Sequence, residues 1–461
     1  VYHALGSYKR FPSLVSYSSN NITKNAKGAG SFRDNANNIF NFVATRTDIF
    51  QLASGAFTSR KSGLTGGEAD YVTFTQFGNY VIASNGVDQP QYYLMGTSTN
   101  FANLNAIQSA GTTPLFRVSG VVRDFLVSGN ISTATNRIHW SGINDISAWS
   151  GKQSDFQDLP GSGGQIVAIT SGEVGYVFRQ NQIIRMDYVG GTVVFRLSVI
   201  SPNRGAIFGR TVCQDNRRVF FYADDGFYEI QGDNVAPIGV EKVNRFFDLN
   251  LNKAYSDRIV AAVDPFNTLA MWLYPSVNNT SNTTGTCDRI IIYNYATQKW
   301  SLAKTNASQI FSQFVGAYTV ELMDIISQNL EDINAALDTD YWDGGQMFLG
   351  AIDGDFKAAI FSGNSNECEI ETAEIEGFPG ARTNIQGVRP IVDAEATVTV
   401  KTRERLADTE TESSSSTMVD SGINPVRQSG RYIRANVKIP SGTTFNHAQG
   451  IDIIASKGGY R

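Results

Sequence analysis

An all-β fold is predicted by three features of the sequence. The 461-residue chain has 43 glycines and only 18% charged residues, a composition that favours tight turns and strands over helical bundles. Short apolar runs alternate with polar or glycine-containing turns along most of its length. With 41% hydrophobic residues, the chain has enough apolar surface for one large core or two to three smaller ones.

A repeated strand–turn–strand unit organises the chain and predicts a β-propeller. Successive copies start 40, 44, 50, 44, 50 and 78 residues apart, at Asn38, Gly78, Val122, Gly172, Asn216, Phe266 and Gly344. A period of about 40 to 50 residues with this content is typical of propeller blades. We therefore expect a propeller of six or seven blades over residues 32–379.

Two segments depart from the repeat. Residues 303–343 lengthen the last step, and "ELMDIISQNLEDINAALD" has apolar residues at helical spacing, which predicts one inserted helix at about 321–338. Residues 380–461 show a strand, a polar Ser-rich loop and two alternating strands joined by a Pro-Ser-Gly turn. We expect a small β platform module there, with residues 1–31 as an entry segment packing against it. The loop from Arg403 to Thr417 is expected to be mobile and to order only against a partner.

An acidic cluster in "FFYADDGFYEIQGD" raises the question of a metal or proton-transfer site. Its members are Asp224, Asp225, Glu229 and Asp233. Asp225-Gly226 lies between two aromatic, alternating runs, which indicates a two-residue hairpin turn, and the oxygen spacing of a calcium loop is not met. We interpret the cluster as a structural turn, and Asp353-Gly354 in "AIDGDFKAAIF" as the same turn in another repeat.

A second acidic stretch, "NECEIETAEIEG", places Glu367, Glu369 and Glu371 on one face of a strand. Carboxylates that lie so near to one another raise each other's pKa, and such pairs can be catalytic. The face offers no Arg, His or aromatic neighbour to separate an acid from a nucleophile. Three interpretations stay open: a solvated or lumen-facing acidic strand, a cation or subunit contact, and catalysis.

The patterns of cofactor, metal and nucleophile chemistry are missing from the sequence. The three histidines and three cysteines have no metal-ligand or disulfide spacing; they are His3, His139, His447, Cys213, Cys287 and Cys368. "GSGGQI" lacks the lysine and helix of a phosphate-binding loop, and no GxSxG motif occurs. We predict no cofactor, no metal and no enzymatic activity. The formal charge of −5 argues against tight nucleic-acid binding, and no apolar run reaches the about 20 residues of a membrane span.

Several stretches resemble one protein family. They are "ALGSYKRFPSL", "NRIHWSGINDISAWSG", "GGQIVAITSGEVGYVFRQNQIIRMDYVGG", "GRYIRANVKIPSGTTFNHAQGIDI" and the closing "KGGYR". Together they are similar to the tail-hub or nozzle proteins of short-tailed bacteriophages, also described as packaged-DNA-stabilisation or tubular tail proteins. The likeness covers most of the chain, and the inserted helix departs from it.

The resemblance implies a structural virion protein that is assembled in the host cytoplasm and has no membrane insertion of its own. It implies a homohexameric ring below the portal and adaptor proteins, with tail fibre or spike proteins around or below the ring. Each subunit would be a propeller with a small platform domain. The ring would retain packaged double-stranded DNA and let it pass during ejection without binding it tightly.

A conduit for DNA should carry few cations, because each Lys or Arg that neutralises a phosphate adds affinity. The helix and the Glu367 strand are candidates for an acidic lumen; their acids are Glu321, Asp324, Glu331, Asp332, Asp338, Glu367, Glu369 and Glu371. A helix face that is simply solvated remains the competing interpretation.

Two other classes of function stay open. A propeller that binds a glycan or a receptor would show an aromatic platform at the blade tips, such as an exposed Trp149 or Trp342. A glycosidase would need two carboxylates about 5 to 10 Å apart in a pocket near the propeller axis. A six-fold ring with an axial hole would favour the conduit, and a monomer would remove it.

Overall fold

The computed structural model describes residues 1–461 except 5, 192, 280–285, 315–346 and 460–461. The described residues are almost all in strands and turns, and they divide into two compact units. The larger unit comprises Leu14–Gln298 and Thr305–Ile360, and the smaller comprises Val1–Ser13, Lys299–Lys304 and Phe361–Arg461. The helix predicted at about 321–338 lies outside the described residues.

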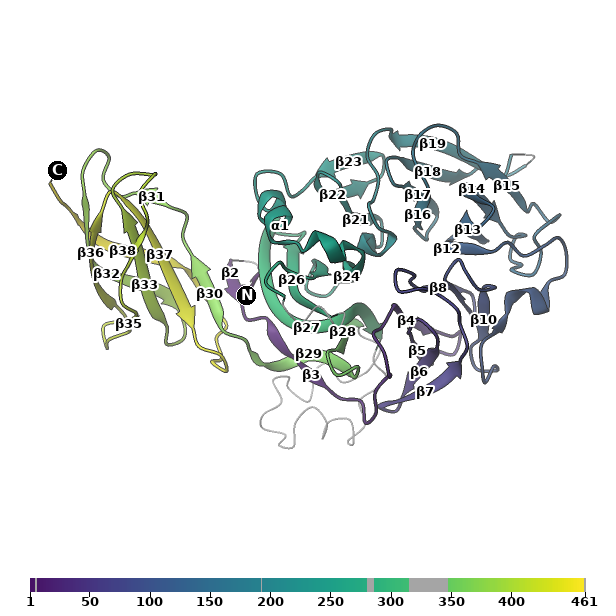
Figure 1. The fold of residues 1–461 in the computed structure, drawn as a ribbon, viewed down its shortest axis with the longest axis horizontal. Coiled ribbons are helices and arrows are strands. Elements are labelled where there is room, and N and C mark those ends of the chain that lie inside the picture. Colours follow the sequence, from purple (N-terminus) through teal and green to yellow (C-terminus); the bar gives the residue numbers. More distant parts are fainter. Residues whose placement is uncertain (5, 192, 280–285, 315–346, 460–461) are drawn as a thin grey trace. The chain divides into compact units, whose positions relative to one another are not determined.

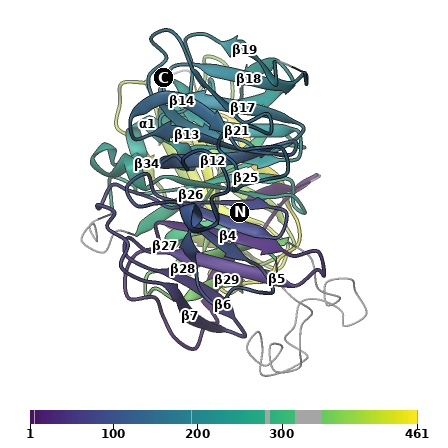
Figure 2. The same ribbon diagram turned by 90° about the vertical axis from the view of Figure 1, so that its right-hand side faces the viewer.

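The larger unit is a β-propeller, as predicted, and its described residues form seven blades of four antiparallel strands (Figure 1). Five blades are separate sheets. From the innermost strand outward, they are β4 (Gly28–Arg33), β5 (Ile39–Ala44), β6 (Ile49–Ala53), β7 (Ala56–Lys61); β8 (Thr73–Phe77), β9 (Tyr80–Ser84), β10 (Gln91–Leu94), β11 (Ala102–Asn103); β12 (Phe116–Val122), β13 (Phe125–Ile131), β14 (Ala134–Trp140), β15 (Asp155–Asp158); β16 (Ile166–Ile169), β17 (Val174–Arg179), β18 (Ile183–Tyr188), β19 (Phe195–Ser201); and β20 (Cys213–Asp215), β21 (Arg218–Ala223), β22 (Gly226–Gln231), β23 (Asn234–Pro237). The strands of the first blade run side by side in both Figure 1 and Figure 2.

The sixth and seventh blades share one seven-stranded sheet. Its order is β24 (Val260–Asp264), β25 (Leu269–Tyr274), β26 (Cys287–Asn294), β27 (Lys299–Phe314), β28 (Met347–Asp353), β29 (Ala358–Ser365) and β3 (Pro12–Ser16). The long strand β27 begins beside β26 and ends beside β28, so it contributes to both blades. Strand β3 is the outermost strand of the seventh blade, so the two ends of the propeller close the ring through one sheet.

The blades are held together by apolar side chains between neighbouring sheets. Val43 and Leu52 of the first blade pack with Ile352 and Ala358 of the seventh, which completes the ring. The second strands are largely buried on both faces, as in β13, where every residue from Phe125 to Ile131 is buried. All seven repeat copies seen in the sequence supply the second and third strands of a blade, because only these strands carry long apolar runs.

Short helical segments connect some blades. They are η1 (Leu104–Ile107), η2 (Gly209–Thr211), α1 (Asn244–Asn250) and η3 (Lys253–Arg258). Helix α1 is anchored by the fully buried Phe247, whose ring lies 5.0 Å from that of Tyr222 and 4.9 Å from that of Phe227. On the same helix Phe246 and Leu249 are exposed.

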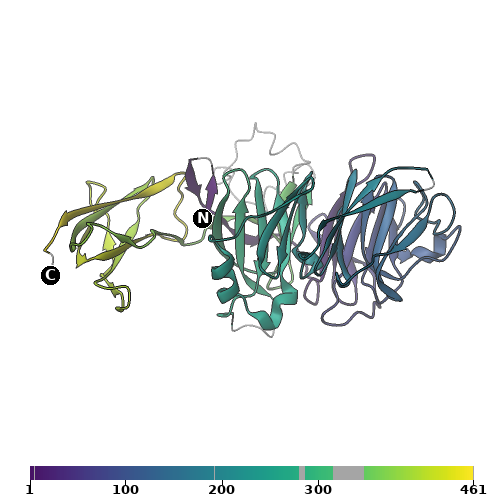
Figure 3. The ribbon, with the colours of Figure 1, turned by 90° about the horizontal axis from the view of Figure 1, so that it is seen from above.

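The smaller unit is a β-sandwich (Figure 3). One sheet has the order β1 (Tyr2–Ala4), β2 (Ser7–Lys9), β38 (Ala448–Lys457), β32 (Thr383–Val392), β36 (Asn424–Gly430); the other has β30 (Cys368–Glu371), β37 (Tyr432–Ile439), β33 (Thr397–Arg403), β34 (Thr411–Glu412), with β31 (Ile375–Glu376) beside β37 and β35 (Ser416–Thr417) beside β33. Val388 from the first sheet and Val398 and Val437 from the second are fully buried in the common core.

Two expectations for the sandwich differ from the structure. The unit begins at Phe361 and not at 380, because β30 and β31 pair with β37, and of the entry segment only Val1–Ser13 belongs to it. The loop from Arg403 to Thr417 was expected to need a partner, but β34 and β35 pair with β33 of the same chain. The last two strands, β37 and β38, are joined through the Pro-Ser-Gly turn as predicted, and because they lie in opposite sheets this connection crosses the sandwich.

Candidate functional site: the central cavity of the propeller

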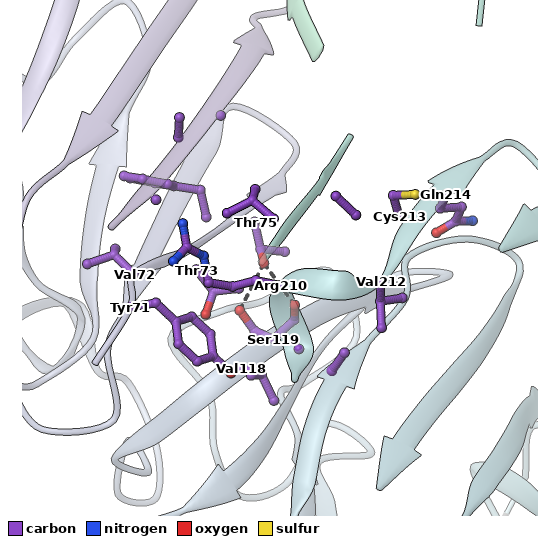
Figure 4. A pocket seen from close by; sticks show the side chains of 18 of the residues that line it. Tyr71, Val72, Thr73, Thr75, Val118, Ser119, Arg210, Val212, Cys213 and Gln214 are labelled. Atoms are coloured by element: carbon purple, nitrogen blue, oxygen red, sulfur yellow. Dashed lines mark hydrogen bonds between the residues drawn. The ribbon is translucent and has the colours of Figure 1, made fainter. Parts of the chain in front are cut away.

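A cavity of about 650 Å³ lies at the centre of the propeller, where the innermost strands of the blades face one another (Figure 4). Its wall comes from β4, β8, β12, β16 and β24, from the segment at η2 and β20, and from the second half of β27. The described lining combines apolar groups, hydroxyls and amides with two cations, Lys27 and Arg210, and it contains no Asp or Glu. The described lining of this cavity is therefore polar and carries positive charge.

The innermost strands approach one another closely at glycines. A Cβ atom on Gly28 would lie 2.0 Å from the carbonyl oxygen of Val72 in the next blade. A Cβ atom on Gly209 would lie 1.9 Å from the carbonyl oxygen of Val167. Both distances are far below contact distance, so only glycine fits at these two positions. Neighbouring blades are thus in backbone contact near the start of their innermost strands.

Side chains bridge blades that are not neighbours. The Tyr71 hydroxyl, just before the second blade, donates to the Val167 carbonyl of the fourth blade at 3.4 Å. The Arg210 guanidinium, just before the fifth blade, donates through Nη2 to Oε1 of Gln309 in the seventh at 2.5 Å. These links cross the centre of the propeller. A DNA duplex, whose major groove alone is about 12 Å wide, cannot pass along this axis.

Several hydroxyls of the wall satisfy backbone groups of a neighbouring blade. Thr73 Oγ1 donates to the Arg117 carbonyl at 2.6 Å. Thr75 Oγ1 donates to the Ser119 carbonyl at 3.0 Å (Figure 4). Ser312 Oγ donates to the Val263 carbonyl at 2.5 Å. Because these bonds occupy carbonyl oxygens of the innermost strands, they leave fewer acceptors for a guest in the cavity.

The two cations of the cavity repel one another. Burial lowers the pKa of Lys27, and the positive charge of Arg210 lowers it further. The Lys27 ammonium donates to the Glu68 carbonyl and lies 4.0 Å from the exposed Glu68 carboxylate. Burial also lowers the pKa of Arg210, while the Asp257 carboxylate acts in the opposite direction on both cations. Both side chains are partly exposed on the cavity wall, and the protein around them removes part of their hydration.

The acidic cluster at residues 224–233 is a hairpin, as predicted, and its acids are held apart. Its two-residue turn is Asp224-Asp225, one position earlier than expected, and Gly226 opens β22 at φ +137°. Different arginines bind three of the acids: Arg204 lies 2.8 Å from Asp225, Arg218 2.5 Å from Glu229, and Arg185 2.6 Å from Asp233. No shared site forms among them.

Asp353-Gly354 is also at a hairpin turn, and Asp353 organises it. Strand β28 ends at Asp353, and the turn occupies residues 354–357. The buried Asp353 carboxylate accepts from the backbone amides of Asp355 and Lys357 at 2.9 and 2.8 Å. It also accepts from the hydroxyl of Ser16 on β3, so this turn helps to hold the strand that closes the ring.

The acids of β30 share one exposed face, as predicted, but the expectation that no arginine adjoins them is wrong. Lys401 of β33 donates to Glu371 at 3.1 Å, and Arg434 of β37 lies 3.7 Å from the same carboxylate. Glu369 accepts from the amide of Asn436, and Glu367 is exposed just before the strand. The sequence around β30 did not predict these cations, because they come from strands that are distant in the sequence. Whether this face lines a lumen stays a prediction, as it does for Glu321, Asp324, Glu331, Asp332 and Asp338, which lie outside the described residues.

The remaining candidate residues are structural where the structure describes them. His139 lies on β14 with Nε2 3.2 Å from the Trp149 carbonyl, and Trp149 is buried, so it is no exposed platform; Trp342 lies outside the described residues. The three cysteines are free. Among the described residues no group of three or more His, Cys, Asp or Glu could hold a metal, and no helix there is long and apolar enough to cross a membrane.

Sequence reasoning missed Lys27 and Arg210. Each stands in a short polar stretch between blades, "NAKGAG" and "IFGRTV", and neither stretch matches a known motif. A signal was available: Lys27 adjoins Gly28, which opens the innermost strand β4, and Arg210 adjoins Gly209, shortly before the innermost strand β20. Their convergence depends on ring closure, which no local pattern reveals.

Comparison with models of known protein families gives no match, and neither does comparison with curated protein sequences. Among solved structures, the chain is similar to a chain from the mitotic checkpoint complex (TM-score 0.42, 12% identity, 78% of this chain and 98% of that one) and to U3-55K (0.43, 9%, 76% and 99%). BamB from Moraxella catarrhalis is a third similar structure (0.40, 11%, 76% and 91%). At these identities and TM-scores the likenesses carry no inference about function.

Proposed function

We propose that the chain is a structural subunit of a bacteriophage tail, which assembles with identical copies into a ring that retains packaged DNA and conducts it during ejection. The observation that carries the proposal is the junction between two stretches that resemble nozzle proteins. Tyr8, in "ALGSYKRFPSL", pairs with Ala448 at the head of the last strand, which holds "AQGIDI". Stretches from opposite ends of the chain thus build one platform module, which fits a subunit that presents this module to an adjoining ring.

The DNA path in this proposal runs between subunits. The propeller axis is bridged by Tyr71 and Arg210, so a single subunit offers no passage for a duplex. Several subunits arranged around a common axis would supply a channel without any change in their fold. Portal and adaptor proteins would lie above such a ring, and tail fibre or spike proteins around or below it.

The channel lining is proposed to be neutral or charge-balanced. On the β30 face Lys401 and Arg434 lie beside Glu371, and Glu369 accepts from the neutral amide of Asn436, so two cations offset part of the acidic charge. A balanced surface neither attracts the phosphate backbone strongly nor repels it, and DNA can slide past it. An enzymatic alternative gains no support from the described cavity, whose lining offers no pair of carboxylates.

Electron microscopy and native mass measurement of the purified full chain test the proposal. We expect six-fold rings with an axial hole, together with DNA binding that is weak and depends little on salt. A particle that stays monomeric at every concentration up to that of assembled tails would contradict the ring. Tight binding of linear duplex DNA that weakens steeply with salt would contradict a passive conduit even if rings form.

A further inference from the structure

Arg210 has an unusual environment for a partly buried guanidinium that lines a cavity. It carries five N–H donors, and in the described structure its side chain makes one hydrogen bond, to the neutral amide oxygen of Gln309. It forms no ion pair with a carboxylate of the described residues. Partly buried arginines are commonly paired with a carboxylate, because protein around an uncompensated charge removes part of its hydration. The remaining donors of Arg210 therefore lack a charged acceptor.

The neighbourhood of Arg210 adds further positive charge. Lys27 lines the same cavity, and the repulsion from Arg210 acts on it more strongly than the attraction of either nearby carboxylate. Those carboxylates are Glu68, which is largely exposed, and Asp257; Arg258 contributes another positive charge nearby. Neither carboxylate is part of the cavity lining. Positive charge thus exceeds negative charge inside the cavity.

The wall also favours a guest that accepts hydrogen bonds. Thr170 Oγ1 accepts from the Tyr176 amide at 2.9 Å, and Ser171 Oγ accepts from the Val121 amide at 2.9 Å. Because each of these hydroxyls is occupied as an acceptor, its own proton remains for donation. Meanwhile Thr73 and Thr75 occupy carbonyl oxygens that would repel an anion.

We propose that the central cavity binds a small oxyanion of the phosphate type, held by the guanidinium of Arg210 and the ammonium of Lys27. The planar fork of a guanidinium matches two oxygens of such an anion, and the ammonium adds a point charge. A bound oxyanion would compensate both cations and join the first, fifth and seventh blades at the centre of the ring. The inference goes beyond the proposed tail function and does not rest on it.

The experiment measures binding of inorganic phosphate to the full chain by calorimetry and by the shift of the thermal unfolding midpoint. Sodium chloride at equal ionic strength is the reference, because it screens charge without offering the paired oxygens of an oxyanion. The variants are Arg210→Gln, Arg210→Lys and the matched control Arg196→Gln. Arg196 is an exposed arginine on the outermost strand β19, far from the axis in the blade.

We expect saturable binding of phosphate to the native chain and to Arg196→Gln. Loss of a charge-assisted hydrogen bond should weaken binding about tenfold or more in Arg210→Gln. Arg210→Lys should lie between them, because it keeps the charge without the fork. Equal affinity in the native chain and Arg210→Gln would overturn the proposal, as would an absence of saturable binding to the native chain.

A second measurement covers the case in which the Arg210 variants do not fold. The structure of the native chain is determined at a saturating concentration of phosphate. Tetrahedral density within hydrogen-bonding distance of Arg210 supports the proposal. Density only at surface sites, or an empty cavity at that concentration, overturns it.

Discussion

Arg179 should be the most costly single arginine to replace in the propeller. The side chain is 2% exposed at the end of β17, and it donates to four acceptors. Three of these are carbonyl oxygens in the glycine-rich loop before β16: Pro160 at 2.7 Å, Gly161 at 3.1 Å and Gly164 at 2.9 Å. The fourth is Oε1 of Gln182 at 2.8 Å. The loop that superficially resembles a phosphate cradle is thus wrapped around an internal cation.

The magnitude follows from the geometry of these bonds. Arg179→Lys keeps the charge, but a single ammonium cannot reach acceptors on three sides, so at least two of the four bonds should be lost. A hydrogen bond to a charged group contributes roughly 1.5–3 kcal/mol, and water entry recovers part of it. We therefore expect a loss of about 3 kcal/mol in the free energy of unfolding. For a propeller of roughly 340 residues that unfolds in one step, this corresponds to a fall of about 4 °C in the midpoint.

The assay is equilibrium unfolding in denaturant, combined with limited proteolysis of the loop at residues 160–164. Arg179→Lys should lower the unfolding midpoint and speed cleavage within this loop, because the loop loses its internal anchor. Arg196→Lys, on the exposed face of β19, is the control and should change stability by less than about 0.5 kcal/mol. An Arg179→Lys chain with native stability and native resistance to cleavage would refute the reasoning.

Three further predictions follow from other contacts. Asp353→Ala removes hydrogen bonds to the amides of Asp355 and Lys357 and to the Ser16 hydroxyl, and should destabilise the propeller by about 2–3 kcal/mol in denaturant unfolding; Asp355→Ala should have little effect. Phe246→Ser with Leu249→Ser removes an exposed apolar pair of α1 and should shift rings toward monomers in sedimentation without changing monomer stability; unchanged rings would exclude this face as a subunit contact. Hydrogen bonds from Arg403 lower the pKa of Glu374, so the pair stabilises the sandwich above the ordinary pKa of 4.5, and this stability should be lost as the pH falls below that value; Glu374→Gln should flatten that pH dependence, and an unchanged profile would contradict it.

The sequence predicted the propeller because its strongest signals are local. The second strand of each blade is largely buried and the third partly so, and both appear as apolar runs. The acidic residues at 224–225 and Asp353 mark the turns between such strands, the first one position earlier than predicted. The outer and inner strands carry weaker patterns, which left six or seven blades open. The seventh blade is built from β27, β28, β29 and the N-terminal β3, and no local pattern brings β3 to that sheet.

The central cavity could not be predicted for a related reason. Lys27, Arg210 and Gln309 meet only because the ring closes, and each of them is unremarkable in its own segment. The acids of β30 are a second case in which residues distant in the sequence determine the local charge. They form an acidic stretch in the sequence, but Lys401 and Arg434 reach Glu371 from neighbouring strands. Runs of like charge in a β protein therefore indicate the charge of a surface only after the cross-strand partners are known.

This distinction bears on how a tail conduit could work. Repulsion of DNA by an acidic wall would require carboxylates that lack cationic partners, and on the β30 face Glu371 has two cations beside it. A wall of balanced ion pairs acts differently: it presents no net field beyond about one Debye length, roughly 8–10 Å at physiological salt. Passage of DNA along such a wall should then be nearly independent of ionic strength, whereas an acidic wall would make release faster at low salt. The salt dependence of DNA release from assembled tails therefore separates the two mechanisms, and a marked acceleration at low salt would show that acids outside the described residues dominate the lining.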